Sequence, residues 1–111
     1  MDIIFDTEEL RDACNHEKRA KKAFGAENAK KIRQRLDDMR AADCLFRLYA
    51  LPGKCHALKN DLAGKYAVHL AGGYVLIFEP ANDPVPLNAD GAVDPLKVTA
   101  VRIVAIEDYH D

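Results

Sequence analysis

Apolar residues in the first half of the chain recur every three or four positions, which is the spacing of one face of a helix. A short apolar strand over Met1–Phe5 is followed by Asp6 and Glu9, a pattern that predicts a helix start with a capping carboxylate. We expect this first helix to run to about Phe24. Gly25 then supplies the left-handed residue that commonly ends a helix.

A second helix is predicted over about Glu27 to Ala41. Its inward-facing residues are Ala29, Ile32, Leu36 and Met39. Its outward-facing basic residues are expected to be Lys30, Lys31, Arg33 and Arg35. The two helices should form a helical hairpin, and a short third helix over Asp43–Ala50 should end at the turn Leu51-Pro52-Gly53.

Beyond this turn the pattern changes to short β-branched and aromatic runs separated by turn residues. The predicted strands are Lys54–Leu58, Lys65–Leu70, Tyr74–Phe78 and Val98–Ile106. Their order predicts an antiparallel meander, so the expected fold class is α+β, with an N-terminal helical hairpin packed on an antiparallel sheet. The proline-rich stretch Pro80–Lys97 should be an irregular excursion, either a binding element or, in our interpretation, a tolerated insertion.

Length and composition limit the possible classes of protein. The 111 residues are enough for a single domain, residues 1–111, with one core. No apolar run approaches the roughly 20 residues of a membrane span, and Met1–Phe5 lacks the features of a signal peptide, so we expect a cytoplasmic protein with no membrane partner. The three cysteines, Cys14, Cys44 and Cys55, show no metal-binding spacing and are expected to be reduced, partly buried thiols.

Charge is unevenly distributed along the chain. The net charge is −2, but residues 11–40 carry ten lysines or arginines against five acidic residues. This basic helical region could face a polyanion, or it could be an ordinary solvated helix surface.

Acid–base chemistry is concentrated in two stretches, Cys55–Asp61 and Ile106–Asp111. They contain the five candidate functional residues His56, Lys59, Asp108, Tyr109 and His110. His69 is interpreted as a residue on the face of a strand and His16 as a residue of an exposed helix, so neither is assigned a role. Imidazole and carboxylate could bind a metal at His56, Asp108 and His110, but no sequence spacing supports such a site, and we expect no metal or cofactor.

Five sequence segments follow one another along the chain: Cys14-Asn15-x-Glu17-Lys18; Phe24-Gly25 with Ala29-Lys30-Lys31-Ile32 and Arg35-Leu36; Leu51-Pro52-Gly53-x-Cys55-His56-x-Leu58-Lys59; Tyr74-x-Leu76-Ile77-Phe78-Glu79-Pro80; and Ile106-x-Asp108-Tyr109-His110. In this order they resemble the HigB branch of the RelE/ParE superfamily, the toxins of bacterial type II toxin–antitoxin modules. No single segment is specific; the specificity comes from their order over one chain of this length.

The resemblance implies a microbial-RNase-like sheet and a ribosome-dependent mRNA endonuclease, with the ribosome, mRNA and a helix-turn-helix antitoxin as partners. It implies active residues at His56, Asp108, Tyr109 and His110, and a phosphate contact at Lys59. Metal-free RNA cleavage needs a base, a cation and an acid, roles that His56, Lys59 and His110 can fill, while Tyr109 can stack on a base or share in proton transfer. Which histidine is the base stays open.

Three positions depart from the pattern of the family. Val75 stands where the family usually has an arginine, which removes a possible cation at the scissile phosphate. Arg102, on the last predicted strand, could replace it if its side chain reaches the same face. Asn60 stands in place of a glycine, and Leu62 in place of a basic residue.

Two classes of function are therefore compatible with the sequence. The first is a working ribonuclease toxin. The second is a catalytically impaired protein of the toxin fold that binds an antitoxin or the ribosome.

Overall fold

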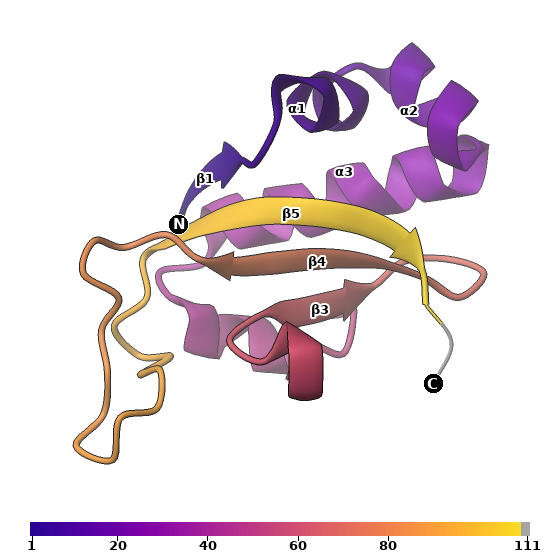
Figure 1. Cartoon of the computed structure of the whole chain (residues 1–111). Helices are drawn as coiled ribbons and strands as arrows, with labels where there is room; N and C mark the ends of the chain where they lie inside the picture. Colours follow the sequence, from indigo (N-terminus) through magenta and orange to yellow (C-terminus); the bar gives the residue numbers. More distant parts are fainter. Residues whose placement is uncertain (110–111) are drawn as a thin grey trace.

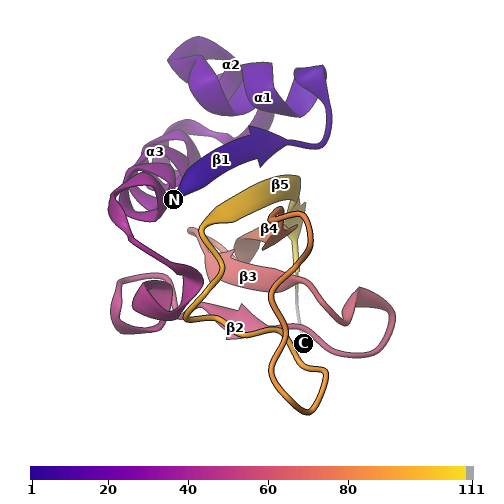
Figure 2. The same cartoon turned by 90° about the vertical axis from the view of Figure 1, so that its left-hand side faces the viewer.

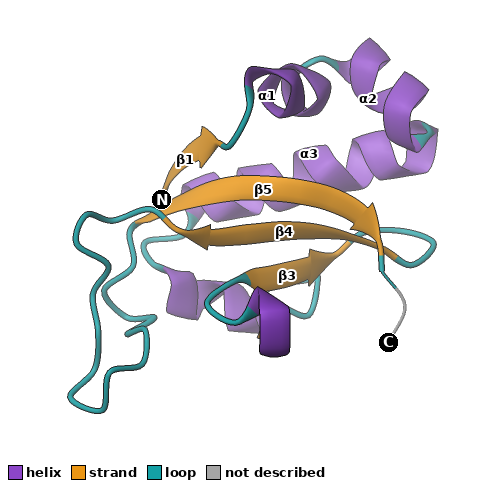
Figure 3. Ribbon diagram, in the orientation of Figure 1, coloured by secondary structure: helices purple, strands orange, loops and turns teal. Residues whose placement is uncertain are grey.

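The computed structural model describes residues 1–109 as a layer of helices over one face of a five-stranded sheet (Figure 1). The helices are α1 (Glu8–Asn15), α2 (Glu17–Phe24) and α3 (Ala26–Ala41), with short 3₁₀ helices η1 (Leu45–Ala50) and η2 (Asn60–Leu62). The strands are β1 (Asp2–Phe5), β2 (His56–Ala57), β3 (Tyr66–His69), β4 (Tyr74–Pro80) and β5 (Ala100–Asp108). The α+β class is confirmed (Figure 3).

The first predicted helix is two helices, because the chain is extended at His16, with φ −117° and ψ 114°. The His16 amide still donates to the Asp12 carbonyl, and its carbonyl accepts from the Ala20 amide, so this one residue ends α1 and begins α2. The predicted capping by Asp6 is also wrong: Thr7 is the N-cap, and its hydroxyl accepts from the Leu10 amide at 3.1 Å. The break turns α2 onto α3, so the predicted hairpin is a three-helix layer.

Helix α3 buries the predicted apolar residues Ala29, Ile32, Leu36 and Met39. The prediction for Arg35 is wrong, because this side chain is only 9% exposed and its Nε donates to the His69 carbonyl at 2.9 Å. A backbone carbonyl at the end of β3 thus gives the buried guanidinium a partner, which buried charge requires. The region predicted as a third helix forms η1, which places Leu45 and Leu48 in the core.

The sheet has the order β1-β5-β4-β3-β2. Strands β2 to β5 form the predicted antiparallel meander, and β1 adds to its edge by parallel pairing with β5. Strand β2 has only two residues, because the chain is left-handed at Lys54, with φ 50°, and again at Asn60, with φ 57°. Asn60 can adopt this conformation because its short polar side chain tolerates it.

Each face of the sheet carries its own apolar cluster. The inner cluster joins Phe78, Leu76 and Ile103 to Ile32 and Leu36 of α3. The outer cluster consists of Leu58, Ala67, Val75 and Ile77, with Leu62, Val104, Ala105 and Tyr109 packed against it. Strand β4 is therefore buried on both faces, while the outer face has no α-helix over it among the described residues.

The segment between β4 and β5 extends from the end of the sheet as a long loop (Figure 2). A bridge between Leu87 and Val93 closes its tip, and the Asn82 side chain accepts from the amides of Thr99 and Ala100 at its base. Within residues 1–109, no helix is long and apolar enough to cross a bilayer.

Two glycines with positive φ allow the Arg35 contact to be tested. A Cβ at Gly53 (φ 110°) would lie 2.7 Å from Arg35 Nε, whereas a Cβ at Gly64 (φ 89°) would have nothing within 4 Å. We expect Gly64→Ala to lower the free energy of unfolding by about 1–2 kcal/mol through backbone strain alone. Gly53→Ala should lower it by at least about 1 kcal/mol more, since the charged hydrogen bond is also disturbed. Urea unfolding measures both, and equal losses would contradict the role given to Arg35.

Candidate active site

His56 lies on the short strand β2 at the edge of the sheet and is partly exposed. Its Nδ1 lies 2.9 Å from the carbonyl oxygen of Lys54. A carbonyl can only accept, so Nδ1 is the donor and the ring is held in one orientation. The left-handed backbone at Lys54 directs the chain into β2 at this point.

His69 lies on the same face of the sheet as His56, although the sequence interpretation assigned it no role. His56 is paired with Ala67, and His69 is two residues further along β3, so alternation gives all three the same face. The two imidazole centroids are 5.6 Å apart, and the rings are tilted by 43°. In the sequence, Ala67 and His69 alternate with Tyr66 and Val68, which indicates that Ala67 and His69 share one face of a strand. The contact between His69 and His56 follows only when the β2–β3 register is known.

Val75 lies next to His69 in the row of residues that crosses the sheet. The register aligns His69 with Val75 on β4, and Val75 with Glu107 on β5. Val75 is 1% exposed and belongs to the outer apolar cluster, whereas His69 and Glu107 on either side of it are exposed. The position that resembles the family's arginine is thus a packed aliphatic residue in the middle of the candidate site.

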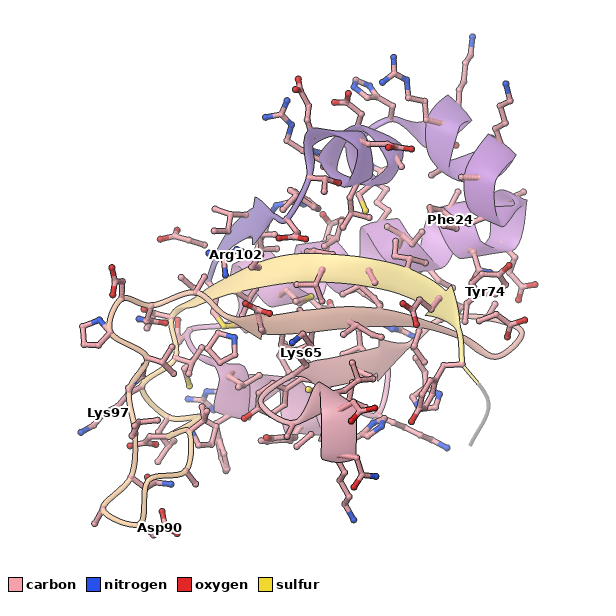
Figure 4. The ribbon with its side chains drawn as sticks, viewed as in Figure 1. Phe24, Lys65, Tyr74, Asp90, Lys97 and Arg102 are labelled. Carbon is pink, nitrogen blue, oxygen red and sulfur yellow. The ribbon has the colours of Figure 1, made fainter. Side chains whose placement is uncertain are left out.

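The end of β5 brings Tyr109 to this face. Its amide donates to the Gly73 carbonyl at 3.0 Å, and its side chain packs against the outer cluster. Asp108 is paired with Tyr74, so alternation directs it to the face opposite that of Val75 and Glu107. Tyr74 makes an edge contact with Phe24 on that side, at a centroid distance of 6.5 Å (Figure 4). The predicted site residue His110 lies outside the described residues.

The two predicted phosphate contacts lie in different places. Lys59 is exposed just after Leu58, in the segment that leads from β2 into η2.

Arg102 is on the outer face, but its Nη1 donates to Glu79 at 3.0 Å, and Lys65 Nζ lies 3.7 Å from the same carboxylate. Glu79 is four residues from Val75 along β4, roughly 13 Å at about 3.3 Å per residue. Arg102 therefore lies at the end of the sheet away from Tyr74 and does not occupy the place of the missing arginine (Figure 4).

The three thiols are free, as expected, and one of them, Cys55, precedes His56. Burial raises the pKa of Cys55 from 9.0 to about 12, so it is a neutral thiol at physiological pH and a poor nucleophile. Among residues 1–109, no group of three or more His, Cys, Asp or Glu side chains is placed to hold a metal ion. Base, acid and aromatic groups are the chemistry that this part of the sheet offers.

Comparison with known proteins finds the same overall fold in solved structures of toxins. A YoeB/ParE toxin from Agrobacterium tumefaciens superposes with a TM-score of 0.61 at 12% identity, covering 99% of this chain and 100% of that one. The YoeB-YefM complex from Staphylococcus aureus gives 0.57 at 17% identity, covering 100% and 98%. The YoeB dimer from the same organism gives 0.56 at 20% identity, with the same coverage. No protein-family model matches the chain, and no curated sequence is significantly similar to it.

The chain has the fold of YoeB/ParE-type toxins over its whole length. At these identities the similarity establishes the fold and not the function. Evidence about function comes from the residues on the outer face of the sheet.

The environment of the thiols leads to a labelling prediction. Burial also raises the pKa of Cys14 from 9.0 to about 11, one unit less than for Cys55. At pH 8 the thiolate fraction should fall roughly a thousandfold at Cys55 and roughly a hundredfold at Cys14, compared with the unfolded chain. Alkylation by iodoacetamide, mapped by mass spectrometry, should therefore be slowest at Cys55. Labelling of Cys55 in the folded protein as fast as in urea would contradict its burial.

Proposed function

We propose that this protein is the toxin of a type II toxin–antitoxin module and that it acts as a metal-independent, ribosome-dependent mRNA endonuclease. One observation supports the proposal. The fold is similar to that of YoeB/ParE-type toxins, and the outer face of the sheet brings His56, His69 and Tyr109 around a small apolar cluster. A ribosomal target would place the protein in the cytoplasm. The assignment to the HigB branch rests on the sequence resemblance.

The chemistry of the face fits cleavage of an RNA strand. An attacking ribose 2′-OH must lose a proton and the leaving 5′-oxygen must gain one, and imidazoles can do both near neutral pH. A tyrosine beside the site offers a surface on which an unstacked base can lie. Lys59, exposed two residues after the end of β2, supplies a cation for the phosphate backbone.

The partner we propose is a helix-turn-helix antitoxin. Support comes from the YoeB-YefM structure, in which a protein of this fold is found in a complex. Exposed apolar side chains near η1 offer a surface for such a partner: Phe46 is 50% exposed, Tyr49 42% and Leu96 63%. Phe46 and Tyr49 are in edge contact, and the Phe46 amide donates to the Pro95 carbonyl, which joins η1 to the long loop.

Val75 favours a second candidate, a toxin-fold protein that binds an antitoxin or the ribosome and cleaves poorly. A valine cannot stabilise charge on a phosphorane, and Arg102 is held by Glu79 at the other end of the sheet. Growth arrest with mapped mRNA cleavage on expression separates the two candidates, because the binding module would give no cleaved message.

The first functional prediction concerns His56. Replacing it with alanine should lower ribosome-dependent cleavage of a defined message by about 10²–10⁴-fold, since one proton-transfer group is lost. The unfolding free energy should change little, because His56 is partly exposed and its hydrogen bond is to the adjacent turn. Cleavage rates and urea unfolding measure the two effects.

His16→Ala is the matched control. This histidine is exposed between α1 and α2, and its side chain makes no capping hydrogen bond. The His16→Ala variant should cleave the message at the rate of the wild type. If His56→Ala retains the wild-type rate, the outer face is not the active site.

The second functional prediction concerns the partner. When the protein is co-expressed with the product of its neighbouring gene, the two should elute together, with an interface on the order of 1,600 Å² or more. Phe46→Ser with Leu96→Ser should weaken the complex, because both side chains are exposed and apolar. The control is Val85→Ser, at the other arm of the loop. Separate elution of the wild-type proteins at every salt concentration would rule out the pairing.

A further inference from the structure

We infer that His56 is the general base of the reaction and that His69 is its general acid. This inference rests on the proposed ribonuclease function and deepens it, because the resemblance assigns no role to His69. It also assigns the first proton transfer to one imidazole.

The hydrogen bond to Lys54 determines the form of His56. Nδ1 donates to a carbonyl, so in the neutral ring Nδ1 carries the hydrogen and Nε2 carries the lone pair. A neutral imidazole with a free Nε2 is the form that a general base requires. Because the bond is to the backbone of the adjacent turn, the orientation of the ring is kept without a second side chain.

The main chain of His69 is held from both sides, while its side chain is exposed. Its amide donates to the Gly53 carbonyl at 2.6 Å, and its carbonyl accepts from the buried Arg35 Nε at 2.9 Å. These two hydrogen bonds fix the position of the backbone from which the side chain projects. Gly53 has no side chain, and this leaves room for Arg35 to reach the carbonyl.

The separation of the rings suits two proton transfers at one phosphate. The imidazole centroids are 5.6 Å apart, so one ring can face the 2′-oxygen and the other the 5′-oxygen of the same phosphodiester. One ring can then take the proton of the 2′-OH while the other donates a proton to the leaving oxygen.

The reaction step balances with these two groups. His56 Nε2 takes the proton of the 2′-OH, and the 2′-oxygen forms a bond to phosphorus. The bond from phosphorus to the 5′-oxygen breaks, its electron pair stays on that oxygen, and His69 donates a proton to it. The products are a 2′,3′-cyclic phosphate and a 5′-hydroxyl, and proton exchange with water restores the pair.

The test uses a message with a sulfur atom in place of the bridging 5′-oxygen at the mapped cleavage position. A thiolate leaves without protonation, so loss of the acid should matter only with the oxygen substrate. His69→Ala and His69→Gln should each cleave the normal message about 10²–10⁴-fold more slowly than the wild type. On the sulfur substrate both should recover to near the wild-type rate, whereas His56→Ala should stay slow on both. Thermal unfolding checks that each variant is folded.

A measurement without catalysis tests the tautomer of His56. In ¹⁵N NMR spectra of the whole protein, the neutral His56 ring should carry its hydrogen on Nδ1. Hydrogen on Nε2 of His56 would overturn the assignment of the base.

The outcomes separate this inference from the proposed function. If the wild type cleaves and the His69 variants stay slow on the sulfur substrate, or cleave the normal message at full rate, His69 is not the acid and the ribonuclease function stands. If the wild type cleaves neither message on ribosomes, the ribonuclease function fails and the inference fails with it.

Discussion

Burial of β4 on both faces is the constraint on which the rest of the structure depends. Its inward residues Leu76 and Phe78 pack under α3, and its outward residues Val75 and Ile77 form the outer cluster. A shift of one residue would exchange these two sets, so the register of β3 and β5 against β4 is strongly determined. That register places His69, Val75 and Glu107 in one row, and the same packing makes Val75 a buried residue rather than a cationic one.

Arg35 connects the helix layer to the candidate site. It comes from the apolar stripe of α3, passes Gly53 and binds the last carbonyl of β3. A buried guanidinium without a hydrogen-bond partner would be strongly unfavourable. The hydrogen bond from Arg35 to the His69 carbonyl therefore stabilises the end of β3 beside the turn at Gly53. The helices therefore contribute to the site without supplying a reacting group: they fix the backbone from which His69 projects.

The outer face combines two residues that the sequence resemblance implies with one to which it assigns no role. Tyr109 and His56 are placed on this face, while Asp108 is directed to the other and Arg102 is engaged by Glu79. His69 lies beside His56, although from periodicity alone it is an ordinary residue on the face of a strand. The chain has the fold of YoeB/ParE-type toxins, and the middle of its outer face is an aliphatic cluster.

Much of the fold could be predicted from the sequence, because it depends on local patterns. The spacing of Ile32, Leu36 and Met39 determined α3, and the runs Tyr74–Phe78 and Val98–Ile106 determined the central strands, since periodicity reports which side of an element is buried. Tertiary structure decided the rest. The burial of Arg35 and the meeting of His56 with His69 each depend on partners distant in sequence or on strand register. Local sequence patterns do not reveal these contacts, because they show which side of an element is buried but not which elements pair with each other.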